Sequence, residues 1–151
     1  MSNSKILSFF FLLVLFICSI STCQKEQAPM KDPVRDGVFI HISNGTNDPH
    51  RVLMALNMAA IMAEDKDVLV YFDIKGVEVV LKDAPDLEFS HFPSSKAQLQ
   101  NLMEKDVSLY VCPGCLKAAG KNEADVMDGV KIAEKQAFFN FTKGRILSLD
   151  Y

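Results

Sequence analysis

The chain has 151 residues, of which 49% are hydrophobic and 23% charged, with a formal net charge of −3. This length allows a single domain, and the composition excludes disordered, collagen-like and low-complexity chains. The net negative charge gives no sign of a basic surface that would bind nucleic acid. Four cysteines are too few for a small domain held together by many disulfides.

The N-terminal segment has the pattern of a secretory signal. Lys5 precedes a mostly apolar run at 6–18. That run is shorter than the roughly 20 residues of a membrane-spanning helix and fits the apolar core of a signal peptide. The stretch Ile20-Ser21-Thr22-Cys23 resembles a bacterial lipobox, in which the cysteine is lipidated after cleavage. We therefore expect a lipoprotein-type signal peptide at 1–22, lipidation of Cys23, and an exported, membrane-anchored protein that faces the periplasm or the cell surface. An uncleaved N-terminal anchor is the alternative.

A tether and one folded domain are predicted to follow. Residues 23–35 are polar and include prolines, which is typical of a flexible linker, and the domain is expected to span 36–151. It opens with a β-branched and aromatic run that predicts a strand over 37–42. Asp48 and Pro49 then predict a helix to about residue 64, with Asp48 as the N-cap and Pro49 in the first helical position.

The rest of the domain alternates between strand and helix patterns. A nearly all-apolar strand is predicted at 67–73, and 77–81 fits either a short strand or a helical turn. The later predicted elements are a weaker extended segment at 89–92, a helix from Ser94 or Ser95 to about 105, a strand at 107–111, a short helix ending at Gly120, a helix at 133–141 and a strand at 145–149. This alternation predicts an α/β fold with a mostly parallel sheet.

Three loops are predicted to meet at one edge of the sheet. In parallel sheets, ligands and reactive groups gather beyond the carboxyl ends of the strands. The loops in that position are 43–48 after the first strand, 73–76 after the second and 112–115 after about the fourth. We expect Asn44 and Asp73 to line the site, with a helix or turn cap as the alternative role of Asp73.

The pattern Cys112-Pro113-Gly114-Cys115 carries the most specific chemistry in the sequence. Cys112 ends an apolar strand and Pro113 suits the first position of a helix, so Cys112 is predicted to be an N-cap. Free N–H groups and the macrodipole at a helix start favour an anion, which lowers the pKa of a thiol and makes it a better nucleophile. Cys115 follows one turn later, so the pair can cycle between dithiol and disulfide. Pro113 and Gly114 are expected to line the site, and Gly114 leaves access open.

Other interpretations of the cysteine pair stay open at this point. It could be an inert buried pair, a static disulfide outside the cytoplasm or part of a zinc site. Structural zinc usually has four ligands, and only His41, His50 and His91 could complete the set, none of them with paired spacing. We expect no metal and no cofactor, and interpret His41 as a partly buried histidine with satisfied hydrogen bonds.

The stretch 107–120 resembles the DsrE/DsrF-like family, in which an apolar strand ends at a cysteine and a small-residue helix leads to a glycine eight positions on. Cys112 and Gly120 hold these places. The opening strand around Ile40-His41-Ile42, the turn and helix after it and the closing strand also look like the family, so the resemblance covers about 36–151. It implies a three-layer α/β/α sandwich with a mostly parallel sheet of about five strands, assembly into trimers or hexamers, and a role in sulfur relay.

A thioredoxin-like fold is less similar, because it needs a later proline opposite the motif and no proline follows Cys115. By the family resemblance, Cys112 matches the cysteine that carries a persulfide, and Cys115 is an addition that would resolve it to a disulfide. The expected function is a lipid-anchored thiol protein in which Cys112 accepts sulfane sulfur or exchanges thiols. Expected partners are sulfur donor and acceptor proteins or small thiols, further copies of the chain in a homo-oligomer, and the membrane through the anchor, with no nucleic acid. The alternative is a non-enzymatic oligomeric binding or assembly module whose cysteine pair is a structural disulfide or a metal clip.

Overall fold

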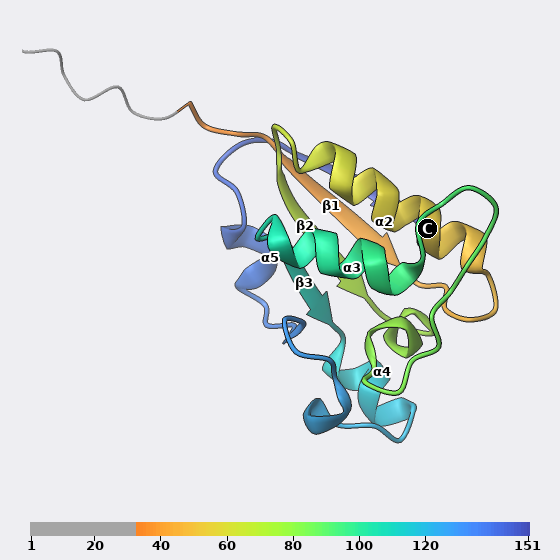
Figure 1. Ribbon diagram of the computed structural model, residues 1–151. Helices are drawn as coiled ribbons and strands as arrows, with labels where there is room; N and C mark the ends of the chain where they lie inside the picture. Colours follow the sequence, from red (N-terminus) through yellow and green to blue (C-terminus); the bar gives the residue numbers. More distant parts are fainter. Residues whose placement is uncertain (1–32) are drawn as a thin grey trace, which may run out of the picture. The chain divides into compact units, whose positions relative to one another are not determined.

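A computed structural model describes residues 33–151 as an α/β domain (Figure 1). Its five strands form one sheet in the order β4-β3-β2-β1-β5, and every neighbouring pair is parallel. The strands are β1 (Gly37–Ile42), β2 (Asp67–Phe72), β3 (Ser108–Val111), β4 (Lys131–Ile132) and β5 (Ile146–Asp150). The helices are α2 (Pro49–Met62), α3 (Ser95–Glu104), α4 (Pro113–Ala118) and α5 (Ala137–Asn140), with 3-10 turns η1 (Gly76–Val80) and η2 (Glu123–Asp125). The predicted α/β class and the parallel five-stranded sheet are confirmed.

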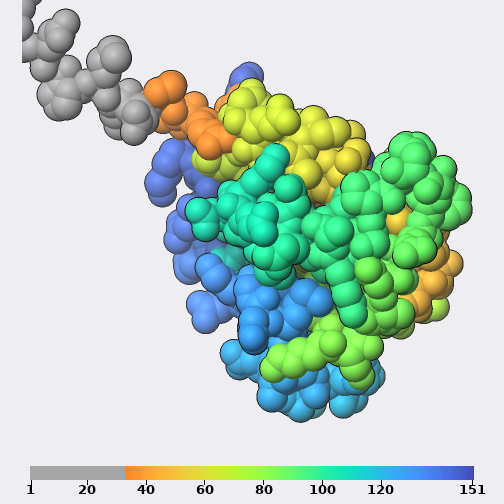
Figure 2. Space-filling model, in the orientation of Figure 1, coloured from red at the N-terminus to blue at the C-terminus, as the bar shows by residue number. Residues whose placement is uncertain are grey.

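One face of the sheet carries the hydrophobic core. Val38, Ile40 and Ile42 alternate along β1 and are at most 2% exposed, because they lie under the helices. α2 and α3 lie side by side over this face (Figures 1 and 2). The Asp48 side chain accepts a hydrogen bond from the N–H of Arg51, so the predicted cap of α2 is confirmed.

The opposite face of the sheet has a much thinner cover, and it is the face that carries the functional site. Strands β1 to β4 follow one another in a single direction across the sheet, and β5 then returns to the far side of β1. Right-handed crossovers therefore place the last helix, α5, on the face opposite α2 and α3. The Phe138 ring of α5 lies 5.8 Å from that of Phe39 and 5.0 Å from that of Tyr71. This third layer is a single short helix, so side chains at the ends of the strands stay partly open.

Several predicted boundaries differ from the structure. Segment 77–81 is largely the 3-10 turn η1. The extended segment predicted at 89–92 is wrong: the N–H of Phe92 donates to the carbonyl of Phe89, and Ser90 has a φ of +53°, so the chain turns back there. Strand β4 was not predicted, because two residues give no periodic signal.

Near the C-terminal end of the domain, the predicted helix at 133–141 is reduced to α5. The N–H of Ala133 still donates to Val111 of β3, so this part of the chain continues the pairing of β4 and turns helical only later. Because neither 77–81 nor 89–92 is a strand, the motif 112–115 follows the third strand and not the fourth.

The predicted signal peptide at 1–22, the lipidation site Cys23 and most of the predicted tether at 23–35 lie outside the described residues. In the described part of the chain, no helix is long and apolar enough to cross a membrane. Arg35, at the end of the predicted tether, donates hydrogen bonds to the carbonyls of Ala63, Asp65 and Lys66 and so fixes the start of the domain.

Candidate functional site

Cys112 is held between a strand and a helix. Its N–H donates to the carbonyl of Phe72 at 2.9 Å, which continues the β2–β3 pairing by one residue. It is also the N-cap of α4, with Pro113 in the first helical turn, as predicted. The Cys112 Sγ accepts a hydrogen bond from the N–H of Cys115 at 3.3 Å, so the sulfur satisfies one of the free donors of the helix start.

The short helix α4 has an ordered end and an open start. Its last turn closes with hydrogen bonds from Gly120 to Lys117 and from Lys121 to Leu116, the Schellman pattern that needs a left-handed residue. Gly120 supplies it with a φ of +70°. At the start, a Cβ on Gly114 would lie 3.8 Å from the Cys112 Sγ. Glycine at this position therefore leaves free space beside the thiol.

The surroundings of Cys112 favour its thiolate. Burial by itself would raise the pKa of the Cys112 thiol. The hydroxyl of Tyr71 and the thiol of Cys115 both donate to its sulfur, and the N–H groups of Cys115 and Gly114 add to them. These donors outweigh burial, and the pKa of Cys112 lies below that of an ordinary thiol.

Cys115 has the opposite tendency. Burial raises the pKa of its thiol, and the neighbouring sulfur of Cys112 and the charge of Asp73 raise it further, against a hydrogen bond from the N–H of Ile74. Both cysteines are free thiols and neither is fully buried. The structure therefore separates the predicted pair into one sulfur that ionises first and one that keeps its proton longer.

Tyr71 belongs to the site and was not predicted. Burial first, and then its hydrogen bond to Cys112, raise the pKa of the Tyr71 hydroxyl, so the phenol keeps its proton and stays a donor. Its ring packs edge-on against Phe138. The register of β2 against β3 places it there, because Tyr71 pairs with Tyr110 and residues 110 and 112 point to the same face of the sheet.

A second group of polar residues extends the site towards β1 and β5. His41 Nε2 lies 2.8 Å from Asp73 Oδ1, and His41 Nδ1 lies 2.9 Å from Asp150 Oδ1. Burial would lower the pKa of His41, but the two carboxylates outweigh it and the pKa is raised. His41 was predicted only as a partly buried histidine, and Asp150 was not predicted at all. Asp73, expected to border the cysteines, lies directly after β2, which pairs with β3, the strand that precedes Cys112.

Asn44 lies apart from this group. Its side-chain oxygen accepts a hydrogen bond from Asn47 at 3.3 Å within the loop after β1. Among the residues that the structure describes, no hydrogen bond joins Asn44 to either cysteine. The residues brought together are therefore Cys112, Cys115, Tyr71, Asp73, His41 and Asp150, with Pro113 and Gly114 at the start of α4.

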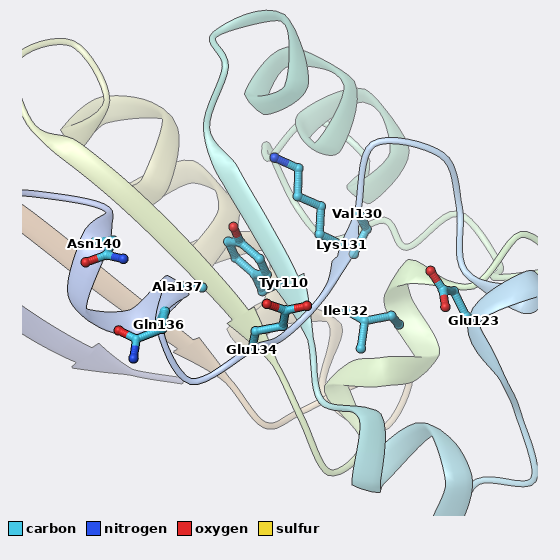
Figure 3. Close-up of a pocket in the computed structure, with 9 residues that line it drawn as sticks. All are labelled: Tyr110, Glu123, Val130, Lys131, Ile132, Glu134, Gln136, Ala137 and Asn140. Atoms are coloured by element: carbon cyan, nitrogen blue, oxygen red, sulfur yellow. The ribbon is translucent and has the colours of Figure 1, made fainter.

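Two cavities lie on the β4 side of the sheet. One of about 520 Å³ is lined by residues of β3, β4, the segment after β4 and α5 (Figure 3), including Tyr110 two positions before Cys112. Another of about 300 Å³ starts at Pro113 and shares Glu123 and Ile132 with the first. Neither is lined by a cysteine.

Within 33–151, no three His, Cys, Asp or Glu side chains are grouped so that they could hold a metal ion. The carboxylates of Asp73 and Asp150 contact opposite nitrogens of the His41 ring, so these three side chains do not converge on one point.

Comparisons with known proteins agree with this architecture. The fold is similar to the crystal structure of the ychN protein from E. coli, with a TM-score of 0.59 and 16% identity over 76% of this chain and 99% of that one. It is also similar to MTH1491, a protein of unknown function from Methanobacterium thermoautotrophicum, with a TM-score of 0.53 and 19% identity over 75% of this chain and 98% of that one. The search of curated proteins gave no match. The family model of the DsrE/DsrF-like family matches residues 36–144. The chain therefore belongs to the DsrE/DsrF-like family.

Proposed function

We propose that this protein is a thiol-based sulfur carrier in which Cys112 is the accepting nucleophile and Cys115 the resolving thiol. Membership of the DsrE/DsrF-like family supports a thiol-related role in sulfur relay. The observation that carries the assignment is the set of donors around the Cys112 sulfur, which includes the N–H of Cys115 at 3.3 Å and the Tyr71 hydroxyl. Such a set stabilises the thiolate, which is the reactive form in attack on sulfur.

The loading step is a displacement at sulfur. The Cys112 thiolate attacks the outer sulfur of a donor persulfide, R–S–SH. A bond forms between the Cys112 Sγ and that sulfur, the S–S bond of the donor breaks, and the electron pair leaves with R–S⁻. The product is a Cys112 persulfide, and the same donors that hold the thiolate surround it.

Two fates follow for the loaded sulfur. An acceptor thiolate can attack the outer sulfur and regenerate the Cys112 thiolate. Alternatively, the Cys115 thiolate attacks the Cys112 Sγ, the Cys112–Cys115 disulfide forms and the pair of electrons leaves with HS⁻. In that second fate the sulfane sulfur is reduced and the two cysteines are oxidised, so a dithiol reductant must restore the pair.

The cellular setting of this chemistry is part of the proposal. The lipobox-like stretch at Cys23 supports an exported protein held to a membrane by lipid, outside the cytoplasm. Its partners are then donor and acceptor proteins or small thiols in that compartment. The hydrophobic side chains exposed on β5 and α5, Ile146, Leu147 and Phe139, support assembly into a homo-oligomer.

The test is the mass of the loaded protein. The reduced full chain is incubated with a small-molecule persulfide donor, and the intact protein and its peptides are weighed. We expect one added sulfur atom on Cys112, lost in Cys112→Ser and accumulated in Cys115→Ser, because the resolving thiol is missing there. If neither cysteine gains sulfur or reacts with an alkylating reagent at neutral pH, the carrier function is wrong and the binding-module alternative stands.

A further inference from the structure

Asp73 is positioned against the cysteine pair through both of its chain neighbours. The carbonyl of Phe72, just before it, accepts the N–H of Cys112. The N–H of Ile74, just after it, faces the sulfur of Cys115. Asp73 therefore lies at the point where β2 ends beside the thiols, and its charge acts on Cys115.

A line of three polar side chains leads from this point to the surface. The Asp73 side chain is 18% exposed, His41 25% and Asp150 72%. The imidazole joins the two carboxylates through its opposite nitrogens, at 2.8 and 2.9 Å. Tyr71 is stacked on the imidazole with its ring centre 5.9 Å away. The titratable groups that face His41 are thus Asp73, Asp150 and Tyr71, and the Phe39 ring is also stacked on it at 6.4 Å. The exposed fraction of the three polar side chains rises along the line away from the thiols.

The contact between His41 and Asp73 has poor hydrogen-bond geometry. His41 Nε2 and Asp73 Oδ1 are within ion-pair distance, yet both are buried atoms without a well-aligned hydrogen bond. A buried polar atom in this state costs free energy and calls for a functional reason. A nitrogen and an oxygen that face each other at this distance can share a proton when one arrives.

We propose that Asp73, His41 and Asp150 form a proton path that takes the thiol proton of Cys115 to solvent during the resolving step. This inference rests on the resolving role of Cys115 proposed above. In the part of the chain that the structure describes, no hydrogen bond joins Asp73 to Cys115 directly, so the proton crosses to the Asp73 carboxylate through a water molecule, and Asp73 passes it to Nε2 of His41. The imidazolium, held between two carboxylates, then releases a proton from Nδ1 to solvent through Asp150. One proton leaves Cys115 and one reaches water. The remaining thiolate attacks the Cys112 Sγ, the new S–S bond forms, and the bond from Cys112 to its outer sulfur breaks as HS⁻ leaves.

A small aromatic disulfide makes this step visible without any sulfane sulfur. With 5,5′-dithiobis(2-nitrobenzoate), the Cys112 thiolate forms a mixed disulfide and releases one coloured thionitrobenzoate anion. The Cys115 thiolate then attacks the Cys112 sulfur, closes the internal disulfide and releases the second anion. This leaving anion needs no proton, so the thiol proton has to go elsewhere. In the full chain Cys18 and Cys23 are replaced by serine in every variant, so that only Cys112 and Cys115 react. Stopped-flow absorbance then separates the first, loading phase from the second, resolving phase.

We expect His41→Gln to slow the second phase at neutral pH by about tenfold, below the roughly 10²–10⁴-fold range of direct acid–base catalysis, and to leave the first phase nearly unchanged. In His41→Ala, which leaves room for a small base, added imidazole restores the second phase. His50→Gln is the matched control, because His50 is an exposed histidine stacked on Phe89 at 4.5 Å, away from the thiols.

Asp73→Asn separates proton transfer from simple electrostatics. Loss of the charge lowers the pKa of Cys115, so a purely electrostatic role predicts a faster second phase, whereas a broken path predicts a slower one. The proposal is overturned if the second phase is unchanged in His41→Gln, if imidazole fails to restore His41→Ala, or if the wild type shows no second phase. Failure of sulfur loading in the mass experiment, with two normal phases here, would instead remove only the persulfide chemistry.

Discussion

Replacing Tyr71 by phenylalanine removes one donor to the Cys112 sulfur and keeps the ring. The variant retains the packing of the ring against Phe138 and loses only the hydroxyl that lowers the pKa of Cys112. Because Tyr71 keeps its own proton, no charge changes at the site when the hydroxyl is removed. The expected effect is therefore confined to the acidity and reactivity of one thiol.

The size of the effect follows from the strength of the lost hydrogen bond. A hydrogen bond to a charged group contributes about 1.5–3 kcal/mol, and the partial exposure of Cys112 puts it at the lower end. About 1.5 kcal/mol corresponds to roughly tenfold less thiolate at a pH below the pKa of the thiol. A more basic thiolate is also a stronger nucleophile, with a Brønsted coefficient of about 0.4–0.5, which returns roughly threefold. The net expectation is about threefold slower alkylation of Cys112 at neutral pH.

The assay is the rate of alkylation by iodoacetamide in a Cys115→Ser background, followed on the peptide that contains Cys112 and measured over a pH range that brackets the titration of that thiol. The rate curves of Tyr71→Phe and its parent are expected to cross, since at high pH both thiols are ionised and the more basic one reacts faster. Tyr110→Phe is the matched control, because Tyr110 pairs with Tyr71 on the same face of the sheet. Equal rates at neutral pH, or a uniform slowing at every pH, would refute the role assigned to the hydroxyl.

Three further predictions concern stability. The pKa of His41 is raised in the folded protein, so the contribution of its protonation to the free energy of unfolding is complete below the ordinary histidine pKa of about 6.5 and is lost as pH rises through the higher folded value. The melting temperature is therefore expected to fall over that pH range in the wild type and not in His41→Gln. Parallel curves of melting temperature against pH would contradict this. Leu109→Ala, at a site 1% exposed under the helices, is expected to cost about 2–5 kcal/mol in urea unfolding. Ile61→Ala, 52% exposed on α2, is expected to stay within about 0.5 kcal/mol, and similar losses in the two variants would contradict the assigned core. In Gly76→Ala the new Cβ would overlap the last backbone carbonyl of β1, and the free energy of unfolding is expected to fall by about 1–3 kcal/mol in the same assay. In Gly114→Ala the new Cβ makes only an ordinary van der Waals contact, so this variant is expected to unfold like the wild type.

Local signals in the sequence predicted the elements that local physics determines. Asp48 and Pro49 mark the start of α2, because a capping oxygen and a fixed φ act within a few residues. Cys112 was found for the same reason, as a side chain that ends one element and caps the next. Alternating or continuous apolar runs likewise predicted β1, β2 and β3 close to their true limits.

The features that sequence reasoning missed depend on pairing between distant segments. Strand β4 exists because two residues meet the edge of β3, and its own sequence contains no strand signal. Tyr71 became a site residue through the register of β2 against β3. Asp150 reaches His41 across 109 positions of sequence. A parallel sheet brings such residues together through its strand order, which single-sequence periodicity does not encode.

That long separation has a consequence for how the protein matures. His41 is on the first strand of the domain and its partner Asp150 on the last, so synthesis delivers the complete cysteine motif before the residue that connects the imidazole to water. Contacts between distant segments form late in folding, because the intervening chain must first be ordered. Until β5 docks beside β1, the chain carries two thiols without the full polar line beside them. If the proton path proposed above operates, docking of the final strand marks when the newly made protein becomes competent for rapid disulfide closure.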